Sequence, residues 1–326
     1  ELIIGFNGEI YNFIEIREKL IKLGYKFLTN SDTEVILQGY KAWNKNLFKK
    51  LRGMFAISIY DILKNEIILA RDHSGQKPLF YYYNQTNKSL IFTSELKGAF
   101  AFKIFSKSVS HDSLSDLMLN GYCSASSSIY TDMKKLSAGS YLSFDLTDNR
   151  LSVVHFWSLE NILKNGKTKN ISEDQLIQNL ENILLESIEM QFRSDVPVGL
   201  LLSGGVDSSL LVALASKIKG NLDTYTVRFS EHKKFDESYH ARLIADNFKT
   251  NHLELEASRV NPSIFEELIN FYDEPIFDTS IIPTYMLSKM ISQHCKVAIG
   301  GDGGDELFGG YPHYDKLLRK KRNSKY

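Results

Sequence analysis

The stretch from Leu200 to Ser209, LLLSGGVDSS, restricts the fold of this chain more than any other feature. An apolar run leads into a loop of small residues, and a helical pattern then follows from Ser208 until Gly220 stops it. The first N–H groups of a helix are unpaired and its dipole is positive there, so such a loop suits a phosphate-type anion. The stretch therefore predicts a buried strand, a phosphate-binding turn and a helix.

The charge of this loop separates it from the common nucleotide-binding turn. The Walker A pattern GxxxxGK[ST] occurs nowhere in the sequence. Asp207 stands where a Walker A loop would carry its lysine, and an acid beside phosphate makes sense when it holds Mg²⁺. The alternative is a strand–turn–helix connection that uses small residues only for packing.

A second string of glycines and acids, GGDGGDELFGGY, runs from Gly300 to Tyr311 after the short strand-like run Lys296 to Ile299. Four glycines and three acids make up its first seven residues, a composition that does not suit a core. Glycine also lets a backbone approach a ligand closely. A Ca²⁺ loop is the alternative, but the EF-hand pattern D-x-[DN]-x-[DN]-G is absent.

The first string resembles the pyrophosphate loop of the ATP-pyrophosphatase superfamily, whose members cleave ATP between the α and β phosphates. Together, the two strings resemble those of glutamine-dependent asparagine synthetases. The resemblance implies that Asp207 and Asp305 bind Mg²⁺, and that Asp302 takes the catalytic acid/base position beside an acyl-adenylate. Family members commonly carry Glu where this chain has Asp302. The resemblance further implies that ATP and pyrophosphate are bound by Leu201, Ser203, Gly204, Gly205, Val206, Asp207, Ser208, Val227 and Gly301.

The first hundred residues carry a different set of motifs. They are NGEIYN at 7–12, NSDTE at 30–34, RDHSGQKPL at 71–79 and SELK at 94–97. Taken singly they are weak, since Asp32 could be only an N-cap and Asn7-Gly8 only a turn. In this order and spacing they resemble the class II glutamine amidotransferase domain, an N-terminal-nucleophile (Ntn) glutaminase, so the resemblance extends over the whole chain.

Free glutamine presents an ammonium, a carboxylate and a carboxamide. A site for it needs an acid for the ammonium, and amide and backbone donors for the other two groups. Asn7, Gly8, Glu9 and Asp32 supply such a set and are the predicted glutamine-binding residues. The resemblance implies that Asn7 and Gly8 also form the oxyanion hole, whose donors are worth orders of magnitude in rate.

The given residues do not include the N-terminal cysteine that the resemblance implies as nucleophile. Family members begin with a cysteine exposed by removal of the initiator Met, whereas this chain begins at Glu1, and its only cysteines are Cys123 and Cys295. We interpret Cys123 as a loop residue and Cys295 as a core thiol. The expectation is an internal part of a longer protein, truncated at both ends, in which the given residues lack the glutaminase nucleophile.

The pattern of elements predicts two domains. Residues 1–157 would form the αββα Ntn-type amidotransferase sandwich, with hairpins built from the runs 54–60, 66–70, 79–83 and 89–93. The polar stretch 158–171 is interpreted as a linker. Residues 173–326 would form a parallel-sheet α/β ATP-pyrophosphatase domain with ligands at the carboxyl ends of its strands. Its expected strands are 199–202, 224–229, 252–255 and 297–299, and its expected helices lie near 174–192, 208–219, 236–247, 262–271 and 283–294.

The predicted activity is ATP-dependent amidation of aspartate to asparagine, with ammonia from glutamine delivered through an internal channel. The stretch Asp273 to Pro283 holds no arginine, unlike aspartate-specific enzymes, so a sugar uronate or natural-product precursor is the alternative acceptor. A non-catalytic scaffold is the second alternative. A net charge of zero gives no reason to expect nucleic acid or a membrane surface as partner. No apolar run approaches a membrane span. We expect a cytoplasmic enzyme, compatible with a homodimer.

Overall fold

The computed structural model of the chain describes residues 1–166, 171–229, 236–257 and 261–323. The chain divides into two compact units. Unit 1 comprises Glu1–Lys169 together with Pro262–Thr279, and unit 2 comprises Asn170–Asn261 together with Ser280–Tyr326. The domain boundaries 1–157 and 173–326 remain a prediction, to which the structure adds that Pro262–Thr279 packs with unit 1.

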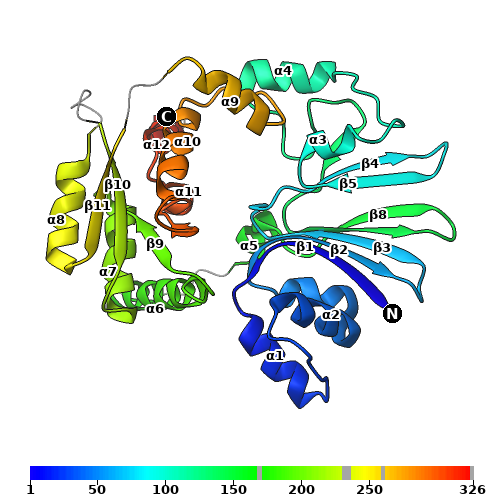
Figure 1. The fold of residues 1–326 in the computed structure, drawn as a ribbon, viewed down its shortest axis with the longest axis horizontal. Helices are drawn as coiled ribbons and strands as arrows, with labels where there is room; N and C mark the ends of the chain where they lie inside the picture. The colour runs from blue at the N-terminus through cyan, green and yellow to red at the C-terminus, as the bar shows by residue number, and fades with distance from the viewer. Residues whose placement is uncertain (167–170, 230–235, 258–260, 324–326) are drawn as a thin grey trace. The chain divides into compact units, whose positions relative to one another are not determined.

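Unit 1 contains two antiparallel sheets (Figure 1). The larger has the order β1 (Leu2–Ile10), β2 (Gly53–Asp61), β3 (Glu66–Arg71), β7 (Ser140–Asp145) and β8 (Arg150–His155). The smaller has the order β5 (Ser89–Thr93), β4 (Phe80–Asn84) and β6 (Met133–Lys135). The antiparallel pairs β2–β3 and β4–β5 confirm the two predicted hairpins.

The packing of unit 1 forms four layers, which confirms the αββα prediction. Helices α1 (Phe13–Lys22) and α2 (Asp32–Trp43) share a core with one face of the larger sheet, through residues such as Leu20 and Ile57. The other face packs against the smaller sheet through residues such as Leu69, Phe144 and Leu79. The outer face of the smaller sheet is covered by α3 (Leu96–Ala99) and α4 (His111–Asn120).

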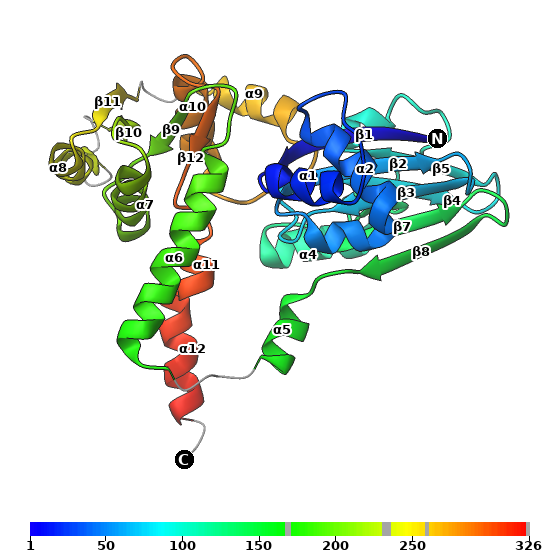
Figure 2. The same cartoon turned by 90° about the horizontal axis from the view of Figure 1, so that it is seen from below.

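Unit 2 is built on a parallel sheet with the order β11 (Asn251–Glu256), β10 (Asp223–Arg228), β9 (Val198–Leu201) and β12 (Val297–Ile299), drawn in Figure 2. Helices α6 (Glu173–Gln191), α7 (Val206–Ile218) and α8 (Ser238–Phe248) share a core with Leu200 of β9. Leu201 points to the opposite face, where Ile291 of α10 (Ile281–Ile291) packs. Helices on both faces confirm the predicted parallel α/β architecture.

The strand order of unit 2 creates a switch point beside β9. The chain runs from β9 outward to β10 and β11 and later returns to add β12 on the other side of β9. In open α/β sheets, ligands bind beyond the carboxyl ends of the strands at such a reversal. The loops that follow β9 and β12 are the two glycine strings.

The stretch 158–171, interpreted as a linker without periodicity, is not irregular throughout. It contains a helix, α5 (Leu159–Asn165), whose N-cap Ser158 accepts a hydrogen bond from the Asn161 N–H. Residues 167–170 of this stretch lie outside the described residues, and its role as a linker stays a prediction. The remaining elements are a 3₁₀ helix over Asn44–Lys50, α9 (Ile264–Phe271), α11 (Gly304–Phe308) and α12 (Pro312–Asn323). Within the described residues, no helix has the length and apolarity needed to cross a membrane.

Candidate functional site

The loop after β9 turns sharply on Gly204, which has a φ of +82°. A Cβ atom at this position would lie 2.5 Å from the Cβ of His240, so only glycine fits. The two serines that flank the turn hold it closed. The Ser203 N–H donates to the Ser208 hydroxyl at 3.3 Å, and that hydroxyl donates to the carbonyl of Gly205 at 3.2 Å.

The start of α7 leaves polar groups without partners. Gly205 is the N-cap residue and has no side chain with which to cap the helix. Among the residues that the structure describes, the buried hydroxyl of Ser209, in the first turn, has no hydrogen-bond partner. Buried polar atoms are usually satisfied, and an orphaned one beside an open helix start suits an oxygen-rich ligand such as a phosphate. Val206 and Asp207 are the first two residues of this helix.

The second glycine string lies directly against the first. Strands β9 and β12 are paired, with Leu200 opposite Ile299, so both loops leave the same edge of the sheet. A Cβ atom on Gly304 would lie 2.6 Å from the carboxyl carbon of Asp207, and one on Gly301 would lie 3.0 Å from the Asp207 Cβ. Asp207 therefore fills the space between the strings, and glycine is required where the second string passes it.

Three carboxylates at this edge are not used by the fold. In the described part of the chain, the side chains of Asp207, Asp302 and Asp305 make no hydrogen bond or ion pair with protein groups. Asp302 is exposed in the turn before α11, and Asp305 lies in its first turn. Free carboxylate oxygens are the ligands that Mg²⁺ prefers, so the chemistry of these donors fits this ion. They are not gathered around one point, since no three His, Cys, Asp or Glu side chains of the described residues form a group that could hold a metal ion.

The other predicted nucleotide residues lie on β9 and β10. Leu201 is the last residue of β9, and Val227 lies in the neighbouring strand β10, where it is half-buried. Just after the end of β9, the Leu202 N–H donates a further hydrogen bond to the carbonyl of Tyr225 in β10 at 2.8 Å. Both residues are thus placed near the carboxyl ends of adjacent parallel strands.

The predicted glutamine residues belong to unit 1. Asn7, Gly8 and Glu9 lie within β1, which continues past the expected apolar run to Ile10. A carboxylate oxygen of Asp32 accepts a hydrogen bond from the Ile10 N–H at 3.1 Å, which brings this acid to the end of β1. Asp32 is not the N-cap of α2, because Ser31 has that role and accepts from the Thr33 N–H.

A contact that the sequence did not predict connects two of the motifs. The Asn7 side-chain amide donates to the Ser94 hydroxyl at 3.3 Å, across 87 residues of sequence. Ser94 and Glu95 precede α3, so the turn at the start of this helix touches the proposed oxyanion residue. No periodicity or spacing in the sequence signals a contact over this separation.

Comparison with known proteins places both halves in one family. Residues 1–157 match the family model described as glutamine amidotransferase domain, and residues 179–326 match the model described as asparagine synthase. The chain belongs to the glutamine-hydrolysing asparagine synthetase family. A Methanocaldococcus jannaschii protein assigned as asparagine synthetase 2 is 36% identical over 319 residues, which are 95% of this chain and 59% of that protein. Asparagine synthetase 1 of Bacillus subtilis is 34% identical over 98% of this chain and 49% of its own length.

This member of the asparagine synthetase family spans about half the length of these curated relatives. Its two cysteines are both unpaired and buried. Cys295 packs in the core of unit 2, as predicted, with Tyr225, Leu255 and Ile291. Cys123 lies in an irregular segment, as predicted, but it also belongs to the core between the smaller sheet and its helices.

Two neighbours in the RDHSGQKPL motif have structural roles. Asp72 is fully buried, and its carboxylate accepts hydrogen bonds from the backbone N–H groups of Phe55, Ser74, Gln76 and Lys77. His73 contacts the rings of Phe156 and Trp157 edge-on, and burial lowers its pKa below the usual value. These environments fix the loop and favour a neutral imidazole, so the surroundings of His73 indicate a structural role.

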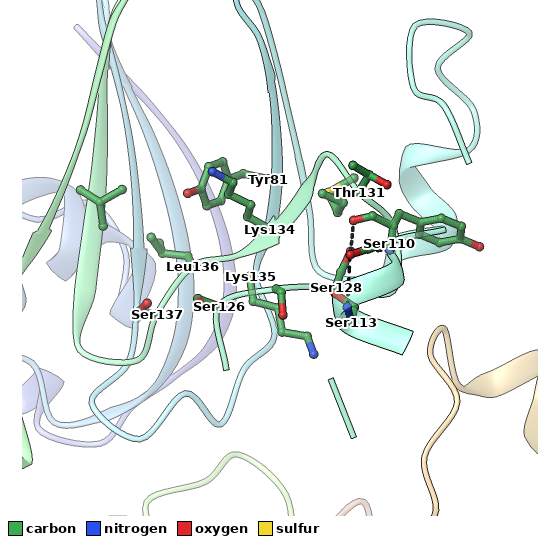
Figure 3. Close-up of a pocket in the computed structure, with 14 residues that line it drawn as sticks. Tyr81, Ser110, Ser113, Ser126, Ser128, Thr131, Lys134, Lys135, Leu136 and Ser137 are labelled. Carbon is green, nitrogen blue, oxygen red and sulfur yellow. Dashed lines mark hydrogen bonds between the residues drawn. The ribbon is translucent and has the colours of Figure 1, made fainter. Parts of the chain in front are cut away.

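Unit 1 also contains a cavity that the sequence did not predict. Its volume is about 400 Å³, and its lining is rich in hydroxyl groups from Ser110, Ser126 and Ser128. Figure 3 shows Lys134 and Lys135 leaving β6 on opposite sides of the strand, as alternation requires. None of the predicted glutamine-binding residues lines this cavity.

Proposed function

We propose that the protein to which this chain belongs catalyses the ATP-dependent amidation of a carboxylate, with ammonia taken from glutamine. The observation that carries the proposal is the contact between the two glycine strings at the switch point of the parallel sheet, with Asp207 between them. Cleavage of ATP between the α and β phosphates needs a polyphosphate cradle and an acid-held metal in one place. The amidotransferase fold of unit 1 supports glutamine as the source of the nitrogen.

The surroundings of several predicted residues support a role for each of them in the ATP-dependent half of the reaction. The open start of α7, with Ser203, Gly204, Gly205 and Ser208, would bind the phosphates of ATP. Asp207 and Asp305 would hold Mg²⁺, which supplies charge neutralisation for the departing pyrophosphate. Asp302, whose carboxylate is exposed and has no described protein partner, would accept the proton that ammonia loses when it attacks the activated carboxyl carbon.

The glutamine half of the reaction belongs to unit 1. Asp32, with Glu9, would face the ammonium of glutamine, and Asn7 with the Gly8 backbone would stabilise the oxyanion formed at its carboxamide. The ammonia released there would pass to the activated carboxylate without meeting bulk water, where it would be protonated. Such delivery raises the effective concentration of the nucleophile.

Aspartate is the first candidate acceptor, and another carboxylate such as a sugar uronate is the second. The stretch Asp273 to Pro283 contains no arginine to face a second carboxylate. Its first two acids are already engaged, since Asp273 accepts from the Leu96 N–H and Glu274 from the Ile129 N–H. An unpaired charge is costly to bury, so this stretch offers aspartate little. We propose a cytoplasmic location and leave a homodimer as compatible with the activity.

The deciding measurement is pyrophosphate release by the full-length protein with MgATP and ammonia. Aspartate would be compared with glucuronate, galacturonate and a panel of other acids at equal concentration. Release with aspartate alone supports asparagine synthesis, and release only with another acid makes that acid class the substrate. Absence of release with every acid would contradict the proposed function. The same assay with glutamine in place of ammonia tests the nitrogen source.

A further inference from the structure

The segment Pro262–Thr279 has contacts that its place in the sequence does not suggest. It lies inside residues 179–326, which match the asparagine synthase family model, yet it packs with unit 1. The chain enters this segment from unit 2 after residue 261 and returns to unit 2 at Ser280. Helix α9 occupies its first half, and Tyr272 to Thr279 form its second half.

Asp273 caps a helix of the amidotransferase fold. Its carboxylate accepts a hydrogen bond of 2.5 Å from the N–H of Leu96, the first residue of α3. The N-cap residue Glu95 makes no capping bond of its own, so Asp273 supplies the acceptor from 177 residues away. Lys97 adds contacts to the carbonyls of Asn270 and Phe271 at 3.4 and 3.5 Å. The Asp273 bond satisfies a first-turn N–H that has no partner within the helix.

Glu274 joins two further parts of the same unit. One carboxylate oxygen accepts from the Ile129 N–H at 2.7 Å, and the other lies 2.6 Å from the ammonium of Lys135. The side chains of Glu274 and Lys135 are only 11% and 18% exposed. A carboxylate so far withdrawn from water is tolerated because it is paired and hydrogen-bonded. Lys135 is one of the residues that line the serine-rich cavity, so this ion pair borders the cavity.

A backbone contact extends the attachment beyond the two acids. The Phe277 N–H donates to the carbonyl of Gly121 at 2.8 Å, at the turn that ends α4. The segment is therefore held at the starts or ends of separate elements, the N-terminus of α3, the C-terminus of α4 and the strand β6. We call residues 273–277 the anchor.

The anchor leads to the predicted glutamine site through a short chain of contacts. Asp273 fixes the N–H of Leu96, and the same turn contains Ser94, whose hydroxyl accepts from the Asn7 amide. A change at Asp273 thus alters the support of a group that would contact glutamine. Asp273 and Asn7 are thus connected through a single turn of the chain, residues 94–96.

We propose that Asp273 and Glu274 are positioning residues that bind the anchor to the amidotransferase fold and hold the Ser94 turn against Asn7. This role rests on the proposed use of glutamine as nitrogen donor. Both ends of Pro262–Thr279 continue into unit 2 along the chain.

The test compares Asp273→Asn and Glu274→Gln with Glu266→Gln in the full-length protein. Glu266 is an exposed acid of α9 in the same segment, so its variant removes the same charge without touching the anchor. We expect amide hydrogen exchange at Leu96 and Ile129 to accelerate at least about tenfold in the respective anchor variants, because each loses a charged acceptor. The control should leave both rates unchanged.

The kinetic readout separates positioning from general damage. Glutamine-dependent kcat/KM should fall about tenfold in the anchor variants, while the ammonia-dependent rate changes less than about twofold. Equal losses with both donors, or unchanged exchange at Leu96 and Ile129, would overturn the proposal. If the protein releases no pyrophosphate under any condition, the proposed function fails, whereas the exchange data still decide the attachment. Should Asp273→Asn not fold, Lys97→Met weakens the same contact from an exposed side chain and should speed exchange at Leu96.

Discussion

At the scale of the residue, the partners of each acid separate support of the fold from availability for chemistry. Asp72 accepts four backbone hydrogen bonds in the core of unit 1, and Asp273 caps a helix. Their oxygens are occupied. Asp207 and Asp302 are acids in the described part of the chain whose side chains make no hydrogen bond or ion pair. A carboxylate that the fold does not use, at the open edge of a parallel sheet, is available to a ligand.

Asp32 tests the glutamine site. In the full-length protein, Asp32→Asn should raise the KM for glutamine about ten- to hundredfold, since a charged hydrogen bond contributes about 1.5–3 kcal/mol. The amide oxygen of Asn can still accept from the Ile10 N–H, so the end of β1 stays in place. Activity with ammonia should be unaffected. A glutamine KM equal to that of the wild type would remove Asp32 from the site.

Asp207 tests the nucleotide site in the same way. Asp207→Asn should lower pyrophosphate release at least about hundredfold, because a lost metal ligand removes several kcal/mol of charge stabilisation. Hydrolysis of glutamine, measured as glutamate formed, should continue. Asp246→Asn is the matched control, since this acid is exposed on α8. Normal ATP-to-pyrophosphate exchange in Asp207→Asn would refute the assignment.

At the scale of the element, local patterns were predictable and distant contacts were not. The strands β9 to β12 were predicted to within a residue or two. β9 is a buried apolar run, and the alternation of strands with helices along this half of the chain indicated the other three. β8 was not predicted, since five of its six residues are exposed and its alternation of polar and apolar residues extends over only four positions. α5 was missed for a similar reason, because none of its residues is buried and no apolar stripe marks it.

In the candidate site, too, the local patterns were predictable from the sequence and the distant contacts were not. The loop after β9 is a local strand–turn–helix unit, so its sequence identifies it without knowledge of the fold. The place of Pro262–Thr279 is different, because it is decided by hydrogen bonds from Asp273 and Glu274 to residues 177 and 145 positions away. Two acids in a polar stretch carry no sign of which backbone groups they will meet.

The anchor can be observed through Cys123. Burial, and secondly the nearby carboxylate of Glu274, raises the pKa of the Cys123 thiol above its usual value. A raised pKa leaves less thiolate at a given pH and slows alkylation. Glu274→Gln removes the negative charge and frees the positive Lys135, and both changes lower the thiol pKa. Labelling of Cys123 by iodoacetamide at pH 8 should therefore accelerate about two- to tenfold.

The second cysteine provides the internal control for this experiment. Cys295 lies in the core of unit 2, so its labelling rate in the same sample should not respond to Glu274→Gln. Mass spectrometry of the two peptides gives both rates at once. Equal acceleration at both cysteines would indicate general unfolding, and no change at Cys123 would contradict the placement of Glu274 beside it.

At the scale of the whole molecule, the chain contains separate cores. The buried clusters of unit 1 are built from residues between Ile10 and Phe156, and those of unit 2 from residues between Ile188 and Cys295. A cooperative unfolding transition reflects one contiguous core, so two cores favour two transitions. The sequence offers a fluorescence probe for one of the two units. Its two tryptophans, Trp43 and Trp157, both belong to unit 1, and unit 2 has none.

This distribution permits a test of where the nucleotide binds. Thermal unfolding followed by tryptophan fluorescence reports unit 1, whereas far-ultraviolet circular dichroism reports both units. A ligand at a hundred times its Kd stabilises the unit that binds it by about 2.7 kcal/mol, which corresponds to several degrees in midpoint. MgATP should therefore raise the circular-dichroism transition that fluorescence does not report, and leave the fluorescence transition in place. Asp207→Asn should abolish the shift. If the fluorescence transition moves with MgATP and Asp207→Asn abolishes the movement, the nucleotide binds unit 2 and the units unfold together. If the fluorescence transition still moves with MgATP in Asp207→Asn, the nucleotide binds unit 1 and the assignment of the site to unit 2 is wrong.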